Sequence, residues 1–304
     1  MESIVVNGIS KWYGKEKLVA LKNVSFTVNQ GEIFGIIGPD GAGKTSLFRI
    51  LTTLLLADEG SATVEGKDVV KQYKQIRNEI GYMPGRFSLY QDLTVKENLT
   101  FFATIFNTTI EENYHLIKDI YVQLEPFNDR RAGKLSGGMK QKLALCCALI
   151  HKPTVLFLDE PTTGVDPVSR KEFWEMLGKL KEQGITILVS TPYMDEASKC
   201  DRIALIQNGS ILATDTPDAI RKSFKSMLYK AKSNNTALLL KDIRSYSKNL
   251  YAYAFGEHVH ITFNPGDIDL EELKMNLTQR NHYDIMLEPD DATIEDCFIQ
   301  MLRA

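Results

Sequence analysis

Cysteine is scarce in this sequence and follows no pattern that would build a metal site or a disulfide framework. The 304 residues include four cysteines, none in CxxC spacing and two of them adjacent, Cys146 and Cys147. Structural zinc sites and small disulfide-rich folds both depend on spaced cysteine pairs. The sequence therefore argues against both classes and favours a reducing compartment.

Long hydrophobic runs are also missing. The longest apolar runs, such as IFGIIG and LALCCALI, fall far short of the roughly 18 to 20 residues that span a bilayer. The opening stretch, MESIVVNGISKWYG, lacks the pattern of a signal peptide. If the protein serves a membrane, we expect another polypeptide to cross it.

Neither sign of charge predominates. The formal net charge is −3 and the pI is about 6.0. Because this balance gives no overall attraction to polyanions, no nucleic-acid partner is predicted. The chain has instead 43% hydrophobic and 25% charged residues, the composition of a well-packed globular protein. Its length suits one large domain or two ordinary ones.

Hydrophobic periodicity divides the chain into two parts. Residues 1–35 alternate polar and apolar positions as strands do, and a helical pattern starts at Thr45. TVLFLDE and GITILVS are short continuous apolar runs, typical of strands buried on both faces of a parallel sheet. After TPDAI comes a basic run, RKSFKSMLYKAK, and then new strand and helix patterns. We therefore predict one domain over 1–215 and a small α+β domain over 216–304.

The stretch GPDGAGKT, residues 38–45, matches the phosphate-binding pattern G-x-x-x-x-G-K-[ST] and lies between an apolar strand and a helix. Gly41 and Gly43 would let backbone amides turn inward around phosphate oxygens at the positive end of the helix. Lys44 would direct its charge toward the outer phosphates, and Thr45 would offer a hydroxyl to Mg²⁺. The alternative is a glycine-rich turn with a surface lysine.

The stretch TVLFLDEP would supply the other half of a nucleotide site. Asp159 ends a buried strand, where its carboxylate can reach a Mg²⁺ ion beside Thr45, and Glu160 is placed to orient or deprotonate water. Seen alone, an acidic pair at a strand end is more often a helix cap or a solvated turn. The phosphate loop upstream favours the catalytic interpretation.

The stretch KLSGGMKQKLALCCALI places Ser-Gly-Gly, residues 136–138, immediately before a helical pattern. Such a group alone is typical of a turn or a helix cap. Between a phosphate loop and an acidic strand, it resembles the signature of the ABC ATPases. The resemblance covers residues 1–215 in order, with Tyr13 in KWYG as the adenine-stacking aromatic and Asp166 in TTGVD as part of a dimer-contacting loop.

This resemblance implies an α/β fold: a P-loop NTPase core of the ABC type with an antiparallel β-subdomain and an inserted helical subdomain at about 84–150, followed by the small α+β domain. It also implies ATP and Mg²⁺ as cofactors, with Thr45 and Asp159 as metal ligands and Glu160 as the catalytic residue. The residues implied to bind this chain's own ATP are Tyr13, Gly38, Pro39, Asp40, Gly41, Ala42, Gly43, Lys44, Thr45 and Ser46.

A head-to-tail dimer is implied as well, in which each ATP lies between one subunit's phosphate loop and the other's signature. Glycine amides at a helix N-terminus, with a serine hydroxyl, form a second anion-binding surface. The residues implied to bind the partner's ATP are Ser136, Gly137 and Gly138. ATP would close the dimer and hydrolysis would open it, and the difference in affinity between the two states can drive a coupled membrane protein.

The stretches SLYQDLTVKENLTFFATIF, YMDEA and ATIEDCFIQML are similar to subunits of bacterial exporters that move drugs, polysaccharides or other hydrophobic cargo. The resemblance implies two partners: an integral membrane permease, and a second ABC ATPase half that is another copy, a different chain or part of the same natural chain. It places the protein in the cytoplasm, peripheral on the inner face of the cell membrane. The alternative is a soluble or regulatory ABC-type ATP-binding protein with little turnover and no membrane partner.

Two positions depart from the family's pattern. In the family, ST-x-YMDEA normally carries a histidine that contacts the γ-phosphate and the attacking water, and this chain has Pro192. A glutamine that ligates Mg²⁺ is usual where this chain has Gly85. Neither proline nor glycine has a side chain able to make these contacts. We predict an ATPase with low activity at its own site, unless another side chain, such as Arg86, substitutes.

Overall fold

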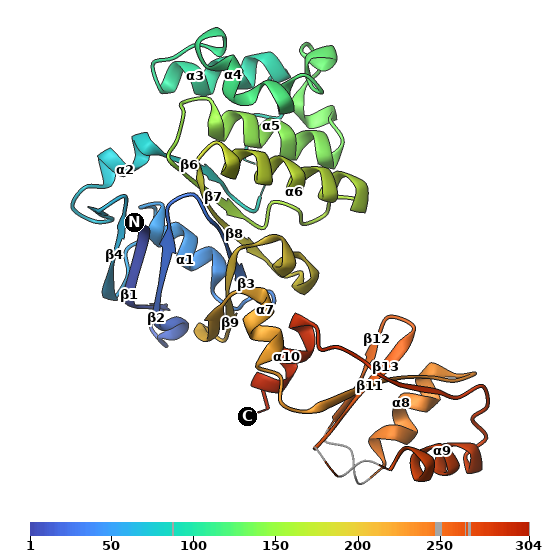
Figure 1. Ribbon diagram of the computed structural model, residues 1–304. Coiled ribbons are helices and arrows are strands. Elements are labelled where there is room, and N and C mark those ends of the chain that lie inside the picture. The colour runs from blue at the N-terminus through green and yellow to red at the C-terminus, as the bar shows by residue number, and fades with distance from the viewer. Residues whose placement is uncertain (87, 247–250, 265, 267–268, 304) are drawn as a thin grey trace. The chain divides into compact units, whose positions relative to one another are not determined.

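The structure, a computed structural model shown in Figure 1, describes residues 1–303 apart from 87, 247–250, 265 and 267–268. The chain divides into two compact units, Met1–Pro217 and Asp218–Ala304. Each unit has its own β-sheets and its own cluster of buried hydrophobic side chains. Each unit therefore has the internal core that independent folding requires.

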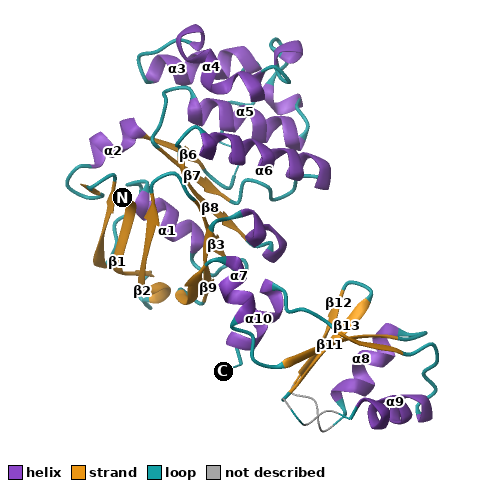
Figure 2. Ribbon diagram, in the orientation of Figure 1, coloured by secondary structure: helices purple, strands orange, loops and turns teal. Residues whose placement is uncertain are grey.

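The first unit is built on a six-stranded sheet with the strand order β10-β9-β3-β8-β7-β6 (Figure 2). Its strands are β3 (Ile33–Ile37), β6 (Ile80–Met83), β7 (Val155–Asp159), β8 (Thr186–Thr191), β9 (Arg202–Gln207) and β10 (Ser210–Asp215). All neighbouring strands are parallel except β10, which pairs with β9 antiparallel. Every residue of β3, β7 and β8 is buried, and for β7 and β8 the continuous apolar runs predicted this.

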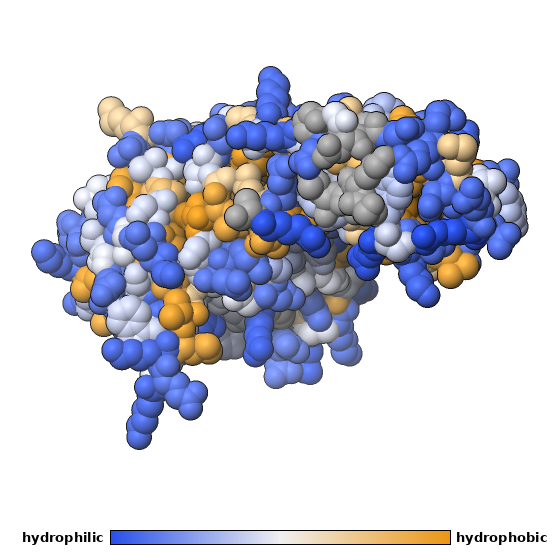
Figure 3. Space-filling view, turned by 90° about the horizontal axis from the view of Figure 1, so that it is seen from below, coloured by the Kyte–Doolittle hydropathy of each residue, from blue (hydrophilic) through white to orange (hydrophobic). Residues whose placement is uncertain are grey.

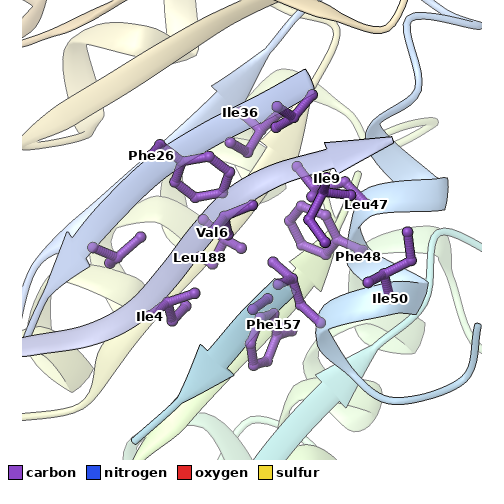
Figure 4. Close-up of a cluster of buried hydrophobic side chains, with 14 of the residues drawn as sticks. Ile4, Val6, Ile9, Phe26, Ile36, Leu47, Phe48, Ile50, Phe157 and Leu188 are labelled. Atoms are coloured by element: carbon purple, nitrogen blue, oxygen red, sulfur yellow. The ribbon is translucent and has the colours of Figure 1, made fainter. Parts of the chain in front are cut away.

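A second, antiparallel sheet has the order β2-β1-β4-β5. Its strands are β1 (Glu2–Tyr13), β2 (Leu18–Asn29), β4 (Glu59–Val64) and β5 (Lys67–Asp68). Figure 4 shows the core shared by the two sheets, where Val6 and Phe26 gather with Leu188 of β8. Helix α1 (Lys44–Leu51) adds Phe48, whose ring meets Phe157 of β7 edge to face at 6.2 Å between centroids. This packing fixes α1, and with it the loop that precedes it.

Helices make up the rest of the first unit. They are α2 (Tyr73–Glu79), α3 (Val95–Ile105), α4 (Ile110–Tyr121), α5 (Gly137–Leu149) and α6 (Pro167–Glu182), with short 3₁₀ turns at Glu125–Phe127, Ala132–Lys134 and Met194–Lys199. Reciprocal capping boxes start two of them, Thr94 with Glu97 at α3 and Thr109 with Glu112 at α4. Parallel sheet, antiparallel sheet and helices together confirm the predicted α/β fold class.

The second unit consists of α7 (Pro217–Lys222), whose first residue belongs to the first unit, and a β-α-β-β-α-β array that ends in one more helix. The array is β11 (Met227–Lys232), α8 (Thr236–Arg244), β12 (Tyr251–Phe255), β13 (His258–Phe263), α9 (Leu270–Gln279) and β14 (Met286–Pro289), and α10 (Ile294–Met301) follows it. The strands pair antiparallel in the order β12-β13-β11-β14, which is the ferredoxin-like split arrangement. Leu239 of α8 and Leu273 of α9 share one core with Ile261 of β13. The α+β character predicted for this part is therefore present.

Hydrophobic residues are concentrated in these cores. On the face shown in Figure 3, hydrophilic residues predominate and hydrophobic ones form small groups between them. Within the described ranges, no helix combines the length and the hydrophobicity needed to cross a membrane.

Candidate nucleotide site and signature helix

The predicted phosphate loop connects β3 to α1 and is shaped by glycines. Gly41 and Gly43 have φ angles of 78° and 105°, in the left-handed region that favours glycine. Gly43 also has no room for a side chain, because a Cβ there would lie 2.3 Å from the carbonyl oxygen of Ala20. At Gly38 a Cβ would lie 2.2 Å from the carbonyl oxygen of Ile206. The loop therefore has the tight turn into a helix N-terminus that suits phosphate binding.

Lys44 is the first residue of α1 and is only 3% exposed. Its ammonium group donates to the carbonyl oxygens of Gly38 at 2.7 Å and Pro39 at 3.0 Å. It also lies 3.0 Å from Oε1 of Glu160. These two carbonyl oxygens of the phosphate loop orient the Lys44 side chain. A phosphate that reached the ammonium group would compete with the Glu160 carboxylate for it.

Asp159 is the last residue of β7 and Glu160 follows it, beside Lys44 of the phosphate loop. Asp159 is 1% exposed and accepts a hydrogen bond from the hydroxyl of Ser190 at 2.6 Å. Glu160 has a φ of 52°, an uncommon value for a non-glycine residue. Its amide donates to both the carbonyl oxygen of Ser190, at 3.1 Å, and the Ser190 hydroxyl, at 3.0 Å. Ser190 therefore fixes the positions of both acidic residues.

A hard cation would find oxygen donors at this site. Among the described residues, no group of three or more histidine, cysteine, aspartate or glutamate side chains could hold a metal ion. Asp159 and the hydroxyl of Thr45 nevertheless fit Mg²⁺, since this ion prefers oxygen ligands and usually shares them with substrate phosphates and water. The site thus suits a metal that arrives with the nucleotide.

Tyr13 ends β1 and lies beside the first turn of α1. Its hydroxyl is 3.1 Å from the hydroxyl of Ser46, 33 positions away in the sequence. The residue is 39% exposed, and the ammonium group of Lys11 lies 5.7 Å from its ring centroid. The fold thus brings an accessible aromatic ring to the edge of the phosphate loop, as base stacking requires.

The predicted signature forms the N-terminus of α5. Ser136 is the N-cap and accepts a hydrogen bond from the amide of Met139 at 3.3 Å. Ser136 and Gly137 are exposed, whereas Gly138 is buried. A Cβ on Gly138 would lie 2.6 Å from Oγ of Ser169, so only glycine allows this approach between α5 and α6. The helix end is open to solvent, and its position is set by α6.

The loop TTGVD leads into α6, where Asp166 is the N-cap. The Asp166 carboxylate accepts from the amides of Val168 at 3.1 Å and Ser169 at 3.0 Å. Hydrogen bonds from Ser169 hold the pKa of Asp166 below its usual value. Asp166 therefore shapes the loop predicted to contact a second subunit.

Both departures from the family pattern lie near this site. A Cβ on Gly85 would lie 3.0 Å from the carbonyl oxygen of Asp159 and 3.7 Å from its Oδ2. A side chain at position 85 would thus start beside the acidic end of β7. Pro192 directly follows β8, two residues after Ser190. Its segment is held by Glu196, whose buried carboxylate accepts from Thr191 at 2.5 Å and from Thr162 at 2.8 Å.

Sequence reasoning did not single out Ser190 or Glu196. Ser190 lies within the apolar run GITILVST, and Glu196 follows that run by five residues. The signal that could have identified Ser190 is a polar residue inside a strand predicted to be buried. Ser190 is fully buried and Glu196 is 2% exposed. A polar side chain in such a place needs a hydrogen-bonding partner, and its partners here are 31 and 34 residues away.

A cavity of about 280 Å³ opens beside β6 and between the helices. Its lining includes Leu54, Met83, Phe102, Phe106 and His151. The ring of His151 stacks on Phe106 at 3.7 Å, and its Nε2 donates to the carbonyl oxygen of Ile80 at 3.0 Å. Burial lowers the pKa of His151, and in the described part of the chain its buried Nδ1 has no hydrogen-bond partner.

Comparisons with known proteins agree with this geometry. A family model described as ABC transporter matches residues 21–163. The chain is 44% identical over 222 residues to the probable multidrug ABC transporter ATP-binding protein YbhF of Escherichia coli (strain K12), covering 72% of this chain and 38% of that protein. It is 35% identical over 303 residues to the Nod factor export ATP-binding protein I of Rhizobium sp. (strain N33), covering 98% and 96%.

Solved structures agree as well. The dimeric structure of a post-hydrolysis state of the ATP-binding cassette MJ0796, bound to ADP and Pi, matches with a TM-score of 0.64 and 26% identity, over 70% of this chain and 98% of that one. The chain spans less than half the length of YbhF but nearly all of the Nod factor export protein. These matches confirm the resemblance read from the motifs: the chain belongs to the family of ABC transporter ATP-binding proteins.

Proposed function

We propose that this chain is the ATP-binding subunit of an export-type ABC transporter and acts in a head-to-tail dimer. The observation that carries the proposal is the presence of two phosphate-binding surfaces in one unit. The phosphate loop at α1 has its lysine and acidic partners, and the exposed N-terminus of α5 carries Ser136 and Gly137. In a head-to-tail dimer each nucleotide would lie between the phosphate loop of one chain and the α5 N-terminus of the other. Both surfaces of every chain would then be used, each on a different nucleotide.

The relatives support the direction of transport. YbhF is named a probable multidrug ABC transporter ATP-binding protein, and the Rhizobium relative is named for Nod factor export. The MJ0796 cassette is a dimer bound to ADP and Pi. We infer an ATP-driven closure of the dimer and a hydrolysis-driven opening, because only a difference in affinity between two states can drive a coupled protein.

In this reading each residue at the nucleotide site has a role. Tyr13 stacks on the base, the glycine-rich loop and Lys44 hold the phosphates, and Glu160 orients or deprotonates water. Mg²⁺, held by Thr45 and Asp159, would supply charge neutralisation at the outer phosphates. Since Lys44 and Glu160 are paired in this structure, the carboxylate becomes available for water only when phosphate takes over the lysine.

The chain's own site is proposed to be catalytically weak. Gly85 and Pro192 lie at this site and cannot supply the amide and imidazole contacts of the family pattern. Removing one preorganised transition-state contact typically costs a factor of about 10² to 10³ in rate. The phosphate loop and Asp159 remain, so ATP binding should persist. The signature, which serves the partner's site, is complete.

A membrane permease is the proposed second partner, and the cavity beside β6 is its proposed docking site. The cavity is lined by Met83, Phe102 and Phe106, and Leu54 at its rim is 57% exposed. The unpaired Nδ1 of His151 would accept one hydrogen bond. A short helix with apolar residues and one donor suits this lining. We place the protein on the cytoplasmic side of the membrane, held there by this partner.

The test compares two substitutions in a dimer with a second ABC half that retains the glutamine and the histidine. Ser136→Arg places bulk at the N-terminus of α5 and should abolish most ATP hydrolysis, because it blocks the competent site. Glu160→Gln should change the steady-state rate little, because it acts in a site that is already slow. If Glu160→Gln is as damaging as Ser136→Arg, the chain's own site is active and the asymmetric proposal is wrong.

A further inference from the structure

We propose that Lys142 is a positioning residue that holds α5 against α6 and so fixes the direction in which the signature, residues 136–138, meets the partner's ATP. The inference deepens the proposed function and rests on it, because it assigns a role at the partner's site. Lys142 belongs to neither of the phosphate-binding surfaces described above. Its effect on the reaction would come through the orientation of a helix.

The first contact between the two helices is steric. Gly138 approaches α6 so closely that a Cβ there would lie 2.6 Å from Oγ and 2.8 Å from Cβ of Ser169. Ser169 is itself fixed, since its amide donates to the N-cap Asp166 at 3.0 Å. The signature therefore rests on the first turn of α6. This steric contact sets how closely the first turn of α5 approaches α6, while the buried residues from Leu143 to Leu149 hold the rest of the helix.

The second contact is ionic and lies one turn further along both helices. Lys142 follows Gly138 by four residues and Glu172 follows Ser169 by three, so each pair shares a helix face. The ammonium group of Lys142 lies 2.6 Å from Oε2 of Glu172 and 2.5 Å from Oε1 of Gln123. Figure 1 shows α5 and α6 side by side. Together the two contacts hold the first two turns of α5, which carry the signature, against α6.

Lys142 is 8% exposed, whereas the side chain of Glu172 is 45% exposed, so the constraint on the contact comes from the buried ammonium group. A buried ammonium group must keep its acceptors, because a buried charge without a partner is strongly unfavourable. Gln123 lies just beyond α4, so Lys142 joins three helical segments around one charge. The lysine can satisfy both acceptors only when α5, α6 and the end of α4 keep one arrangement.

The consequence is specific to the signature. The favourable field of a helix N-terminus falls off within the first turn. The stabilisation of a phosphate by this field therefore depends closely on where the helix end is placed. A misplacement of about 1 Å in a catalytic contact can cost a factor of about 10² in rate. Loss of Lys142 should therefore slow hydrolysis at the partner's site. It should leave ATP binding at this chain's own phosphate loop unchanged, because that loop is positioned by β3 and α1.

The experiment uses the assembled dimer with a competent second ABC half and follows steady-state ATP hydrolysis. Lys142→Met keeps the aliphatic stem and removes the charge, and we expect kcat to fall about tenfold or more. Lys142→Arg keeps the charge and should retain most of the activity. The charge exchange Lys142→Glu with Glu172→Lys should recover part of what Lys142→Met loses. Calorimetry on the single chain should give ATP affinities of the wild type and of Lys142→Met that agree within about twofold.

The outcomes separate the inference from the proposed function. Wild-type kcat in Lys142→Met, together with loss of activity in Ser136→Arg, overturns the positioning role and leaves the proposed function standing. Full activity in both variants overturns the proposed function itself. If Lys142→Met does not fold, Glu172→Ala decides, since it removes the acceptor on α6 by truncating a side chain that is 45% exposed. An unchanged kcat in that variant overturns the inference.

Discussion

At the residue scale, we expect nucleotide affinity to depend most on the side chain of Lys44. Its ammonium group is buried and already oriented by the carbonyl oxygens of Gly38 and Pro39. A charge held in place before the ligand arrives loses little entropy on binding. Because the Glu160 carboxylate pairs with the same ammonium group, we expect nucleotide binding to release this carboxylate from Lys44.

Lys44→Ala should weaken Mg-ATP binding by about tenfold or more, since it removes a charge-assisted contact to phosphate. Isothermal titration calorimetry measures the change. Lys67→Ala is a matched control, because Lys67 pairs with Glu79 in an accessible ion pair on β5 and should leave the affinity unchanged. Equal affinity in wild type and Lys44→Ala would contradict the assignment of the loop.

Gly85 and Pro192 allow a test of the weak site. Gly85→Gln with Pro192→His should raise the ATPase rate of the homodimer by about 10 to 10³, because both substitutions restore polar contacts near Asp159. The close approach of 3.0 Å between a Cβ at position 85 and the Asp159 carbonyl requires a small local shift. Gly85→Ala with Pro192→Ala introduces the same shift without the polar groups and serves as the control. If both double variants hydrolyse ATP equally fast, the missing contacts are not the cause.

At the element scale, a buried carboxylate attaches α10 to the sheet of the second unit. Asp296 has no exposed surface and accepts hydrogen bonds from His260 at 2.8 Å, from the amide of Thr293 at 2.8 Å and from the hydroxyl of Tyr253. Burial by itself raises the pKa of Asp296, but the bonds from His260, Thr293 and Tyr253 outweigh it, and the pKa is lowered. The ionised form is thus the form that holds α10.

Asp296→Ala should destabilise the attachment of α10 by about 3 kcal/mol or more, since it leaves several buried donors without an acceptor. Hydrogen exchange at residues 294–301 measures the loss as faster exchange. Asp269→Ala removes the exposed N-cap of α9 and should cost only about 1 kcal/mol. Equal protection of α10 in wild type and Asp296→Ala would show that the helix is held by its apolar contacts alone.

The sign of the pH dependence follows from the lowered pKa of Asp296. Its contribution is complete above the ordinary pKa of 3.8 and is lost as the pH falls through the lower value of the folded state. Exchange at α10 in the wild type should therefore show no change from this group between pH 8 and pH 5, after correction for the intrinsic rate. Protection should fall below about pH 4. In Asp296→Ala this acid-dependent step should be absent.

The sequence predicted those elements whose pattern is formed by residues that are neighbours in the chain. Continuous apolar runs predicted β7 and β8 as buried strands, and Ser136 lies at the helix start that its pattern indicated. The Lys142 to Glu172 pair and the contact of Gly138 with Ser169 could not be predicted in this way. They depend on which helices become neighbours, and hydrophobic periodicity does not encode that. For the same reason, the strand order of the second unit could not be predicted from the sequence.

At the scale of the whole molecule, each of the two units contains a cluster of buried hydrophobic side chains of its own. The cluster that surrounds α1 draws only on residues up to Ile206, with Ile211 packed against it. The cluster of the second unit begins at Tyr229, with Met227 packed against it. Nucleotide binding should therefore be a property of the first unit alone, because every predicted residue of the site lies within it.

A chain that ends at Pro217 should fold and bind Mg-ATP with an affinity within about twofold of the full chain, since it keeps the first core and all of β10. Thermal unfolding, with Trp12 and Trp174 as reporters in the first unit, and calorimetry measure the two properties. A chain that ends at Gln207 is the matched control: it lacks β10, exposes the edge of β9 and uncovers the core at Ile211. We expect it to unfold at a lower temperature or to aggregate.

If the chain ending at Pro217 behaves like this control, the second unit completes the first and the two are not independent. If both shortened chains bind ATP as the full chain does, β10 is dispensable and the functional boundary lies before residue 208.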